Sequence, residues 1–242
     1  MLELKNISWS LPNGGREVIK DISLSIPQGK LVVVTGPNGG GKTTLAKIIA
    51  GIATPDSGRL LLEGEDITSL DITERAKRDI SFAFQQPVRF KGITVRDLLT
   101  LAAGKELNQA ELCDLLGKVG LCTRDYIDRE VNASLSGGEI KRIEIASVLA
   151  RGTKYSVFDE PEAGIDLWSF TGLIKVFEDL KNINSGTQII ISHQERILNI
   201  ADEIVVIADG KIREYGAKEE ILPKLLAGDK NAGCPVERRV AK

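Results

Sequence analysis

The chain has 242 residues, of which 42% are hydrophobic and 27% are charged, so it can bury a sizeable core in one large domain. Lysine and arginine number 32 against 34 aspartate and glutamate residues, which gives a formal net charge of -2. This balance provides no overall field for nucleic acid or for an anionic membrane surface, and we expect no nucleic-acid partner.

The apolar residues give no sign of a membrane span or a secretory signal. The apolar runs are short, such as residues 31–34 and 189–191, whereas a helix needs ~20 apolar residues to cross a bilayer. The start of the chain lacks the basic and then apolar pattern of a signal peptide. We therefore expect a cytoplasmic protein with no direct membrane span. The cysteines show no CxxC spacing, which fits free or buried thiols in a reducing compartment.

The first fifty residues predict a hairpin followed by a strand, a loop and a helix. Residues 2–8 and 17–26 alternate or cluster apolar side chains as strands do, and residues 12–15, Pro-Asn-Gly-Gly, form a turn between them. This pattern predicts an antiparallel hairpin. Residues 31–34 predict a buried strand, and residues 43–50 have the periodicity of a helix.

The middle of the chain changes from strand to helical periodicity. Short strands are expected at residues 60–62 and 80–84. From about residue 88 to residue 150 the apolar residues recur with a helical period. The amphipathic stretches cover residues 95–102, 109–116 and 140–149. We interpret this region as an inserted helical subdomain.

The last third of the chain returns to a strand pattern. Residues 155–158 and 188–191 are short apolar runs that alternate with helices, which predicts a parallel sheet. Residues 203–208 and 211–214 close it. The predicted fold is therefore α/β, a mixed sheet with an antiparallel β subdomain and the helical insertion.

We predict a single domain over residues 1–226. Its nucleotide core would comprise residues 1–87 and 151–226, because the phosphate-binding and acidic motifs described below fall there. Residues 227–242 mix Gly, Lys, Asp and Arg and predict a mobile tail, in which Cys234 is expected to be a free thiol.

A glycine-rich loop follows the predicted strand at residues 31–34. It has the pattern G-x-x-x-x-G-K-[ST] of a phosphate loop, whose backbone N–H groups point at phosphate oxygens from the start of a helix. We expect Lys42 to contact the β and γ phosphates, Thr43 to supply a hydroxyl to Mg²⁺ and Thr44 to add a phosphate contact. The predicted nucleotide-binding residues are Gly36, Pro37, Asn38, Gly39, Gly40, Gly41, Lys42, Thr43 and Thr44.

Two acidic residues end the predicted strand at residues 155–158. Asp159 can hold Mg²⁺ directly or through water, while Glu160 stands one residue farther towards the γ phosphate. A carboxylate at that place can orient and partly deprotonate an attacking water, so Glu160 is our candidate general base. An ordinary solvated acidic pair is the alternative.

A second phosphate-binding motif, Leu-Ser-Gly-Gly-Glu, occupies residues 135–139 and lies about twenty positions before Asp159. A phosphate loop alone leaves kinases, GTPases and helicases open. The ordered set of phosphate loop, LSGGE and Phe-Asp-Glu-Pro resembles the ATP-binding cassette (ABC) family. This resemblance implies a P-loop NTPase of the ABC cassette fold, an ATP hydrolase, with ATP and Mg²⁺ as its ligands.

The resemblance also implies roles for two residues that would be weak signals alone. Gln85 resembles the Q-loop glutamine that touches Mg²⁺ and the attacking water and links nucleotide state to the helical subdomain. His193, the only histidine, follows a buried strand, where ABC ATPases place the switch histidine that senses the γ phosphate. A satisfied packing histidine is the alternative.

The LSGGE motif implies a dimer. In ABC cassettes Ser136, Gly137 and Gly138 open a helix that faces the ATP held by a second cassette, so we expect homodimerisation on ATP binding. A helix start capped by Ser136 is compatible with this role, because both use the same free N–H groups. Asp166 resembles the D-loop aspartate that crosses the dimer interface.

The adenine contact departs from the family pattern. Many members stack adenine on an aromatic residue two positions beyond Trp9, where this chain has Leu11. Trp9 and Leu11 lie on one face of a predicted strand, so either could cover the base. Trp9 could equally belong to the core.

The flanks of the motifs resemble SufC, the ATPase of the SUF iron–sulfur cluster assembly machinery. Residues 136–145, Ser-Gly-Gly-Glu-Ile-Lys-Arg-Ile-Glu-Ile, are similar to its SGGExKRxEI pattern, and residues 84–88 and 193–198 agree. Transporter cassettes usually have Gln-Gln-Arg after the signature. By this likeness Lys141 can pair with Glu160 in a resting state.

Three functions follow from these resemblances. The first is an ATPase that drives conformational change in a SufB/SufD-like scaffold, docked near residues 87–92 and the helical subdomain. The second is the ATP-binding subunit of a membrane transporter with a permease partner. Residues 161–163, Pro-Glu-Ala, are more similar to transporter cassettes than to SufC. The third is a non-enzymatic clamp, which intact Glu160 and His193 disfavour.

Overall fold

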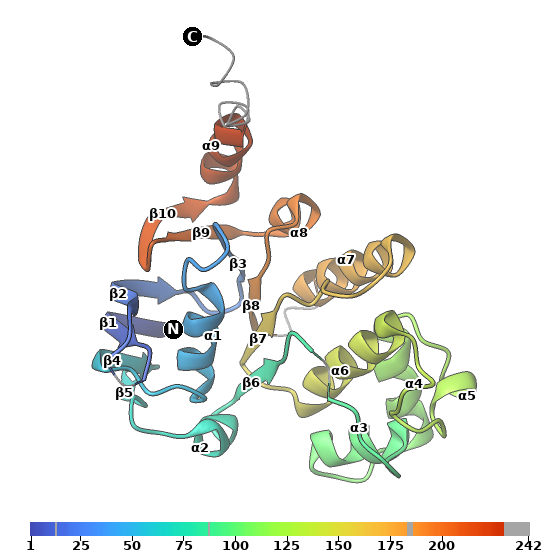
Figure 1. The fold of residues 1–242 in the computed structure, drawn as a ribbon. Helices are drawn as coiled ribbons and strands as arrows, with labels where there is room; N and C mark the ends of the chain where they lie inside the picture. Colours follow the sequence, from blue (N-terminus) through green and yellow to red (C-terminus); the bar gives the residue numbers. More distant parts are fainter. Residues whose placement is uncertain (13, 87, 183–185, 230–242) are drawn as a thin grey trace.

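The computed structural model describes residues 1–12, 14–86, 88–182 and 186–229, and Figure 1 shows their arrangement. Residue 13 of the predicted hairpin turn and residue 87 of the predicted docking surface lie outside the described residues, as do Cys234 and the predicted tail from residue 230 onward. Helix α9 (Lys218–Asp229) continues past residue 227, where the tail was expected to begin.

An antiparallel sheet opens the chain, with the strand order β2-β1-β4-β5. Strand β1 (Leu2–Ser10) pairs with β2 (Glu17–Ile26) and with β4 (Ser57–Leu62), which in turn pairs with β5 (Glu65–Asp66). This arrangement confirms the predicted antiparallel hairpin. Figure 1 shows the sheet beside helix α1 (Lys42–Ala50), the helix that follows the phosphate loop.

A second sheet, with the strand order β10-β9-β3-β8-β7-β6, forms the centre of the described residues. Its strands are β3 (Leu31–Thr35), β6 (Ile80–Ala83), β7 (Tyr155–Asp159), β8 (Thr187–Ile191), β9 (Glu203–Ala208) and β10 (Lys211–Ala217). All neighbouring pairs are parallel except the antiparallel pair of β9 and β10. Strands β3, β7 and β8 are buried throughout, as parallel strands covered on both faces must be. The predicted mixed sheet is therefore confirmed.

Two hydrophobic clusters lie on opposite faces of the central sheet, because successive side chains of a strand alternate between its faces. Val32 and Val34 join the cluster that includes helix α1 and the antiparallel sheet. Val33 joins the cluster that the later helices complete. The sheet is thus fixed from both sides, and the loops at its carboxyl edge are held by rigid strands.

Four helices separate β6 from β7 in the chain. They lie together on the side of the sheet where β6 is the outermost strand (Figure 1). They are α3 (Val95–Ala103), α4 (Gln109–Lys118), α5 (Thr123–Tyr126) and α6 (Gly137–Arg151). Three of the four starts carry a capping box, so these helices begin at sequence-encoded positions. These are the helices of the predicted insertion.

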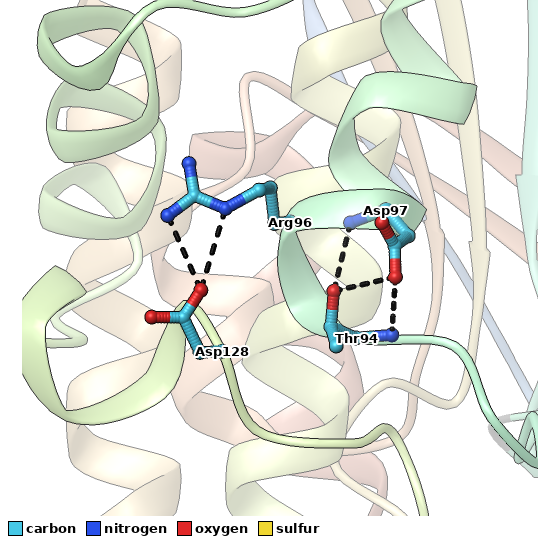
Figure 2. A network of polar contacts seen from close by, with 4 residues as sticks. All are labelled: Thr94, Arg96, Asp97 and Asp128. Atoms are coloured by element: carbon cyan, nitrogen blue, oxygen red, sulfur yellow. Dashed lines mark hydrogen bonds and ion pairs between the residues drawn. The ribbon is translucent and has the colours of Figure 1, made fainter.

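Figure 2 shows the start of helix α3. Thr94 accepts a hydrogen bond from the amide of Asp97, whose carboxylate accepts from the amide of Thr94 in return. Next to this cap, Arg96 and Asp128 form an ion pair of 3.2 Å whose side chains are 41% and 79% exposed. Exposed pairs of this kind contribute little to stability.

Three further helices complete the fold: α2 (Ile72–Ala76), α7 (Leu167–Asn182) and α8 (Glu195–Ile200). Arg75 of α2 is only 1% exposed and donates to the carbonyls of Ile48 and Ile49, the last turn of α1, and to those of Thr68 and Leu70. It therefore caps the phosphate-loop helix. None of the helices in the described ranges is long and apolar enough to cross a membrane.

Candidate active site

The phosphate loop connects β3 to α1 and can only be built from glycine at its critical turns. Gly36 has φ 132°, and a Cβ there would lie 2.0 Å from the carbonyl oxygen of Ile207. Gly41 has φ 108°. The Lys42 Nζ donates to the carbonyls of Gly36 at 2.8 Å and Pro37 at 3.0 Å. The loop thus curls around the lysine.

Lys42 is 5% exposed and carries the central positive charge of the loop. Burial lowers the pKa of its ammonium, while the nearby carboxylates of Glu160 and Asp159 oppose this shift. A buried cation whose hydrogen bonds, among the described residues, go to carbonyl oxygens is suited to bind an anionic group. This environment fits a triphosphate, as predicted for Lys42.

Thr43 and Asp159 meet below the loop. The Thr43 hydroxyl of helix α1 donates to Asp159 Oδ1 at 3.0 Å, and Asp159 is the last residue of β7. Burial raises the pKa of Asp159, since its carboxylate is removed from water. A hydroxyl and a carboxylate oxygen are hard donors of the kind that Mg²⁺ prefers. The two residues therefore fit the predicted magnesium ligands.

Gln85 and Glu160 are brought together from segments 75 residues apart. The Gln85 Nε2 donates to Glu160 Oε2 at 2.5 Å, and the Glu160 amide donates to the carbonyl of Ile191 at 3.0 Å. Glu160 has φ 44°, a left-handed conformation that costs energy for a residue other than glycine. The backbone and the amide of Gln85 thus hold this carboxylate in one direction.

These groups surround one cavity of about 450 Å³. Its lining residues are Val18, Asn38, Gly39, Gly41, Lys42, Thr43, Thr44, Gln85, Glu160 and His193. The structure therefore brings all three predicted catalytic residues to the phosphate loop. Of the other predicted residues, Gly36, Pro37 and Gly40 form the loop behind this surface, and Asp159 lies beneath Thr43. Val18 of strand β2 was not predicted, because nothing local marks an apolar strand residue as cavity-lining.

The signature residues lie outside this cavity. The hydroxyl of Ser136 caps α6, accepting from the amide of Glu139 at 3.3 Å. A Cβ on Gly137 would lie 2.7 Å from the carbonyl oxygen of Gly164, and one on Gly138 would lie 2.6 Å from the hydroxyl of Ser169. The two glycines therefore allow the signature to pack closely against the D-loop and α7.

Asp166 caps the next helix. Its carboxylate accepts hydrogen bonds from the amides of Trp168 and Ser169 and from the Ser169 hydroxyl. The predicted D-loop aspartate is thus a helix cap within its own chain. It does not line the cavity that contains Glu160.

The expected ion pair between Lys141 and Glu160 is wrong for this structure. Lys141 is 2% exposed, pairs with Glu144 at 3.0 Å and donates to the carbonyl of Phe84 at 2.5 Å. Lys141 and Glu144 lie three residues apart on α6, so their side chains share one face of the helix. The carboxylate of Glu160 is bonded by Gln85 instead.

One acidic residue beside the site was missed. Glu162 accepts a hydrogen bond of 2.5 Å from the hydroxyl of Ser192, the residue before His193, and its other carboxylate oxygen is buried with no partner among the described residues. Burial raises the pKa of Glu162, against the opposing hydrogen bond from Ser192. No motif marks this contact, which joins segments 30 residues apart.

Neither candidate for the adenine contact lines the cavity. Trp9 packs against the hydrophobic cluster that contains the antiparallel sheet. Leu11 is 47% exposed. The packing of Trp9 agrees with its core interpretation.

Comparison with known proteins gives concordant results. The sequence profile of the ABC transporter family matches residues 19–163. The chain is 37% identical over 216 residues to an uncharacterized ABC transporter ATP-binding protein, MJ0035, of Methanocaldococcus jannaschii, covering 86% of each chain. It is 32% identical over 228 residues to the lipopolysaccharide export system ATP-binding protein LptB of Haemophilus influenzae, covering 92% of each.

A solved structure agrees with the fold. The ADP conformation of MJ1267, an ATP-binding cassette of an ABC transporter, superposes with a TM-score of 0.81 at 28% identity, covering 95% of this chain and 96% of that one. The residues that the family profile matches include the phosphate loop, residues 135–139 and the acidic pair described above. The chain belongs to the ABC transporter family and is an ABC-type ATPase.

Proposed function

We propose that this chain is the ATP-binding subunit of an ABC membrane transporter. The observation that carries the chemistry is the cavity in which Lys42, Gln85 and Glu160 meet the phosphate loop. The relatives described above are named as transporter ATP-binding proteins, which favours a permease as the partner over an iron–sulfur scaffold.

The residues of the cavity divide the work of hydrolysis. Lys42 and the loop amides bind the phosphates, and Glu160, held by Gln85, accepts a proton from the attacking water. His193 lines the same cavity and senses the terminal phosphate. Thr43 and Asp159 would hold Mg²⁺, which when bound would draw negative charge from the phosphates.

The signature completes the site of a second copy of the chain. Ser136, Gly137 and Gly138 lie outside the cavity of their own chain. The Ser136 hydroxyl accepts from the amide of Glu139. The amides of Gly137 and Gly138, in the first turn of α6, have no preceding turn to bond and are suited to phosphate. Beside them, Trp168 of α7 is 86% exposed next to Asp166. An exposed tryptophan on the predicted interface supports an ATP-dependent homodimer.

A partner would dock beside Gln85. A mostly apolar cavity of about 180 Å³ is formed by residues of the segment after β6 and of helices α3 and α6, among them Phe84, Phe90, Leu98 and Ile143. A helix from a permease presenting apolar side chains fits such a groove. Movement of that helix would reach Gln85, which directly follows Phe84.

The SUF ATPase is the second candidate. Lys141 and Glu144 are both part of the run that resembles SufC, and they form the buried pair beneath Phe84. Lys141 stands at a position where transporter cassettes usually have glutamine. A SufB/SufD-like scaffold would use the same groove, so the two candidates differ in partner and not in chemistry.

The test is capture of the partner from the native host. Glu160→Gln should trap ATP-bound complexes, and Lys42→Met, which lacks the phosphate-binding ammonium, is the matched control. Recovery of an integral membrane protein with Glu160→Gln but not with Lys42→Met supports the transporter subunit. Recovery of a scaffold that carries iron and no membrane protein contradicts it and supports the second candidate.

A further inference from the structure

A buried ion pair fastens the segment that carries Gln85 to the signature helix. Lys141 Nζ donates to the carbonyl oxygen of Phe84 at 2.5 Å, and Glu144 Oε1 accepts from the amide of Phe84 at 3.0 Å. The two side chains bond each other at 3.0 Å. Both polar groups of the Phe84 backbone are thus bonded to side chains of helix α6.

Burial distinguishes this pair from the other ion pairs found among the described residues of the helical region, whose side chains are all more exposed. The side chains of Lys141 and Glu144 are 2% and 17% exposed, and burial raises the pKa of Glu144 against the pull of Lys141. A buried pair gains little net stability over apolar side chains of the same size, because desolvating two charges offsets their attraction. Stability alone therefore gives no reason for charged residues here, whereas fixing a backbone does.

The contacts form a continuous path from the signature to the catalytic base. Helix α6 begins at its cap, Ser136, and carries Lys141 on its second turn. Lys141 donates a hydrogen bond to the carbonyl of Phe84, and the next residue is Gln85. The side-chain amide of Gln85 donates to the carboxylate of Glu160 at 2.5 Å. Every step is a covalent neighbour, a helix or a hydrogen bond.

We propose that Lys141 and Glu144 are positioning residues that fix Gln85 to helix α6, so that Gln85 orients Glu160 only while α6 is in place. The inference rests on Glu160 as the base of the proposed function. A shift of α6, through its signature end or through a partner in the groove at Phe84, is thereby passed to the carboxylate that activates water.

The decisive variant is Lys141→Met combined with Glu144→Leu. Apolar side chains of similar size should preserve folding, while the hydrogen bonds to Phe84 are removed. The matched control is Arg96→Met with Asp128→Leu, which removes the exposed pair of Figure 2 from the same subdomain. Lys141→Arg, which keeps a charged donor, serves as the conservative variant.

Loss of the two side chains should lower kcat and leave ATP binding unchanged. For K141M/E144L we expect an unchanged Kd for ATP and a kcat at least about tenfold lower, because misplacing a catalytic group by an ångström costs on the order of 100-fold. Lys141→Arg should regain most of the loss, and the control pair should leave both constants unchanged. A folded K141M/E144L with the kcat of the unmodified chain overturns the proposal.

A second measurement does not depend on hydrolysis. In amide hydrogen exchange, the peptide that contains Phe84 and Gln85 should exchange faster in K141M/E144L and at the unmodified rate in the control. Equal protection in both variants overturns the proposal that Lys141 and Glu144 fix the segment of Phe84 and Gln85 to α6, even if Glu160 proves not to be the base. If Glu160→Gln keeps full ATPase activity while hydrogen exchange responds as expected, Glu160 is not the base, but the fixing of Phe84 and Gln85 to α6 is supported.

Discussion

The two phosphate-binding elements of the chain differ in how much of their site the chain itself supplies. Around the phosphate loop, Lys42, Gln85 and Glu160 converge on one cavity from three separate segments. At the signature, Ser136 caps its own helix and the adjoining glycines pack on the D-loop, away from that cavity. The phosphate-loop side, called here the finished half, is a nearly complete site. The signature side, called here the prepared half, is the surface that we propose faces a second copy.

This difference explains the division of charge between them. The finished half holds buried charges, Lys42 and Asp159, each with hydrogen-bond partners inside the chain. The prepared half exposes apolar and polar groups together, with Trp168 86% exposed beside the cap of α7. Changes in the first half should therefore alter chemistry or folding, and changes in the second should alter association.

Glu160→Gln should give the largest effect, within the finished half. The amide keeps the size of the side chain but cannot accept a proton, so kcat should fall by about 10²- to 10⁴-fold while ATP binding is retained. Steady-state ATPase assays with equilibrium nucleotide binding measure both. The exposed Glu178→Gln is the control, and an equal fall in binding and kcat would refute the role as base.

Arg75→Met tests the support of the finished half. Its guanidinium caps α1 through the carbonyls of Ile48 and Ile49, and its loss should destabilise the chain by about 3 kcal/mol because buried acceptors lose a charged donor. Chemical denaturation measures the change. Arg78→Met, which removes an exposed pair with Glu65, should change stability by less than about 0.5 kcal/mol.

Trp168→Ala addresses the prepared half. Large aromatic side chains dominate the energy of interfaces, so its loss should weaken the ATP-dependent dimer of Glu160→Gln by about tenfold. Analytical ultracentrifugation with and without ATP gives the dimer constant. Leu101→Ala, 72% exposed on α3, is a matched apolar control. Equal dimer constants for the two variants would place Trp168 outside the interface.

Glu162→Gln should give the smallest effect, on the pH dependence of stability. Burial raises the pKa of Glu162 in the folded chain above its ordinary value of 4.5, so the folded state binds this proton more tightly than the unfolded state. Stability then decreases as pH rises from the unfolded pKa through the folded one. The amide removes that decrease, so between pH 4.5 and pH 7 the free energy of unfolding should fall less in Glu162→Gln than in the unmodified chain.

Unfolding by denaturant at several pH values measures the slope. The exposed Glu17→Gln should leave the profile as it is in the unmodified chain. A profile for Glu162→Gln parallel to that of the unmodified chain would show that Glu162 has the same pKa in both states.

The parts of the site that could be predicted from the sequence are those whose residues are adjacent in the chain. The phosphate loop could be predicted because strand, glycines and helix are adjacent, and the acidic pair because Asp159 directly ends a buried strand. The capping of α1 by Arg75 and the contact of Glu162 with Ser192 could not be predicted, because the partners lie 26 to 30 residues away and carry no motif. Lys141 was assigned to Glu160 by resemblance, although Glu144 lies three residues farther along the same predicted helix. The contacts of this pair with the backbone of Phe84 could not be predicted, because they join segments that are far apart in the sequence.

The central claim is that the signature of one copy completes the cavity of another. The most direct measurement is the ATPase rate of Lys42→Met and Ser136→Arg chains, alone and mixed. Each alone should be inactive, while the mixture should recover about a quarter of the unmodified rate, because about half of the dimers are mixed and each has one intact site. Full activity of Ser136→Arg alone, or a mixture no more active than its components, would contradict it.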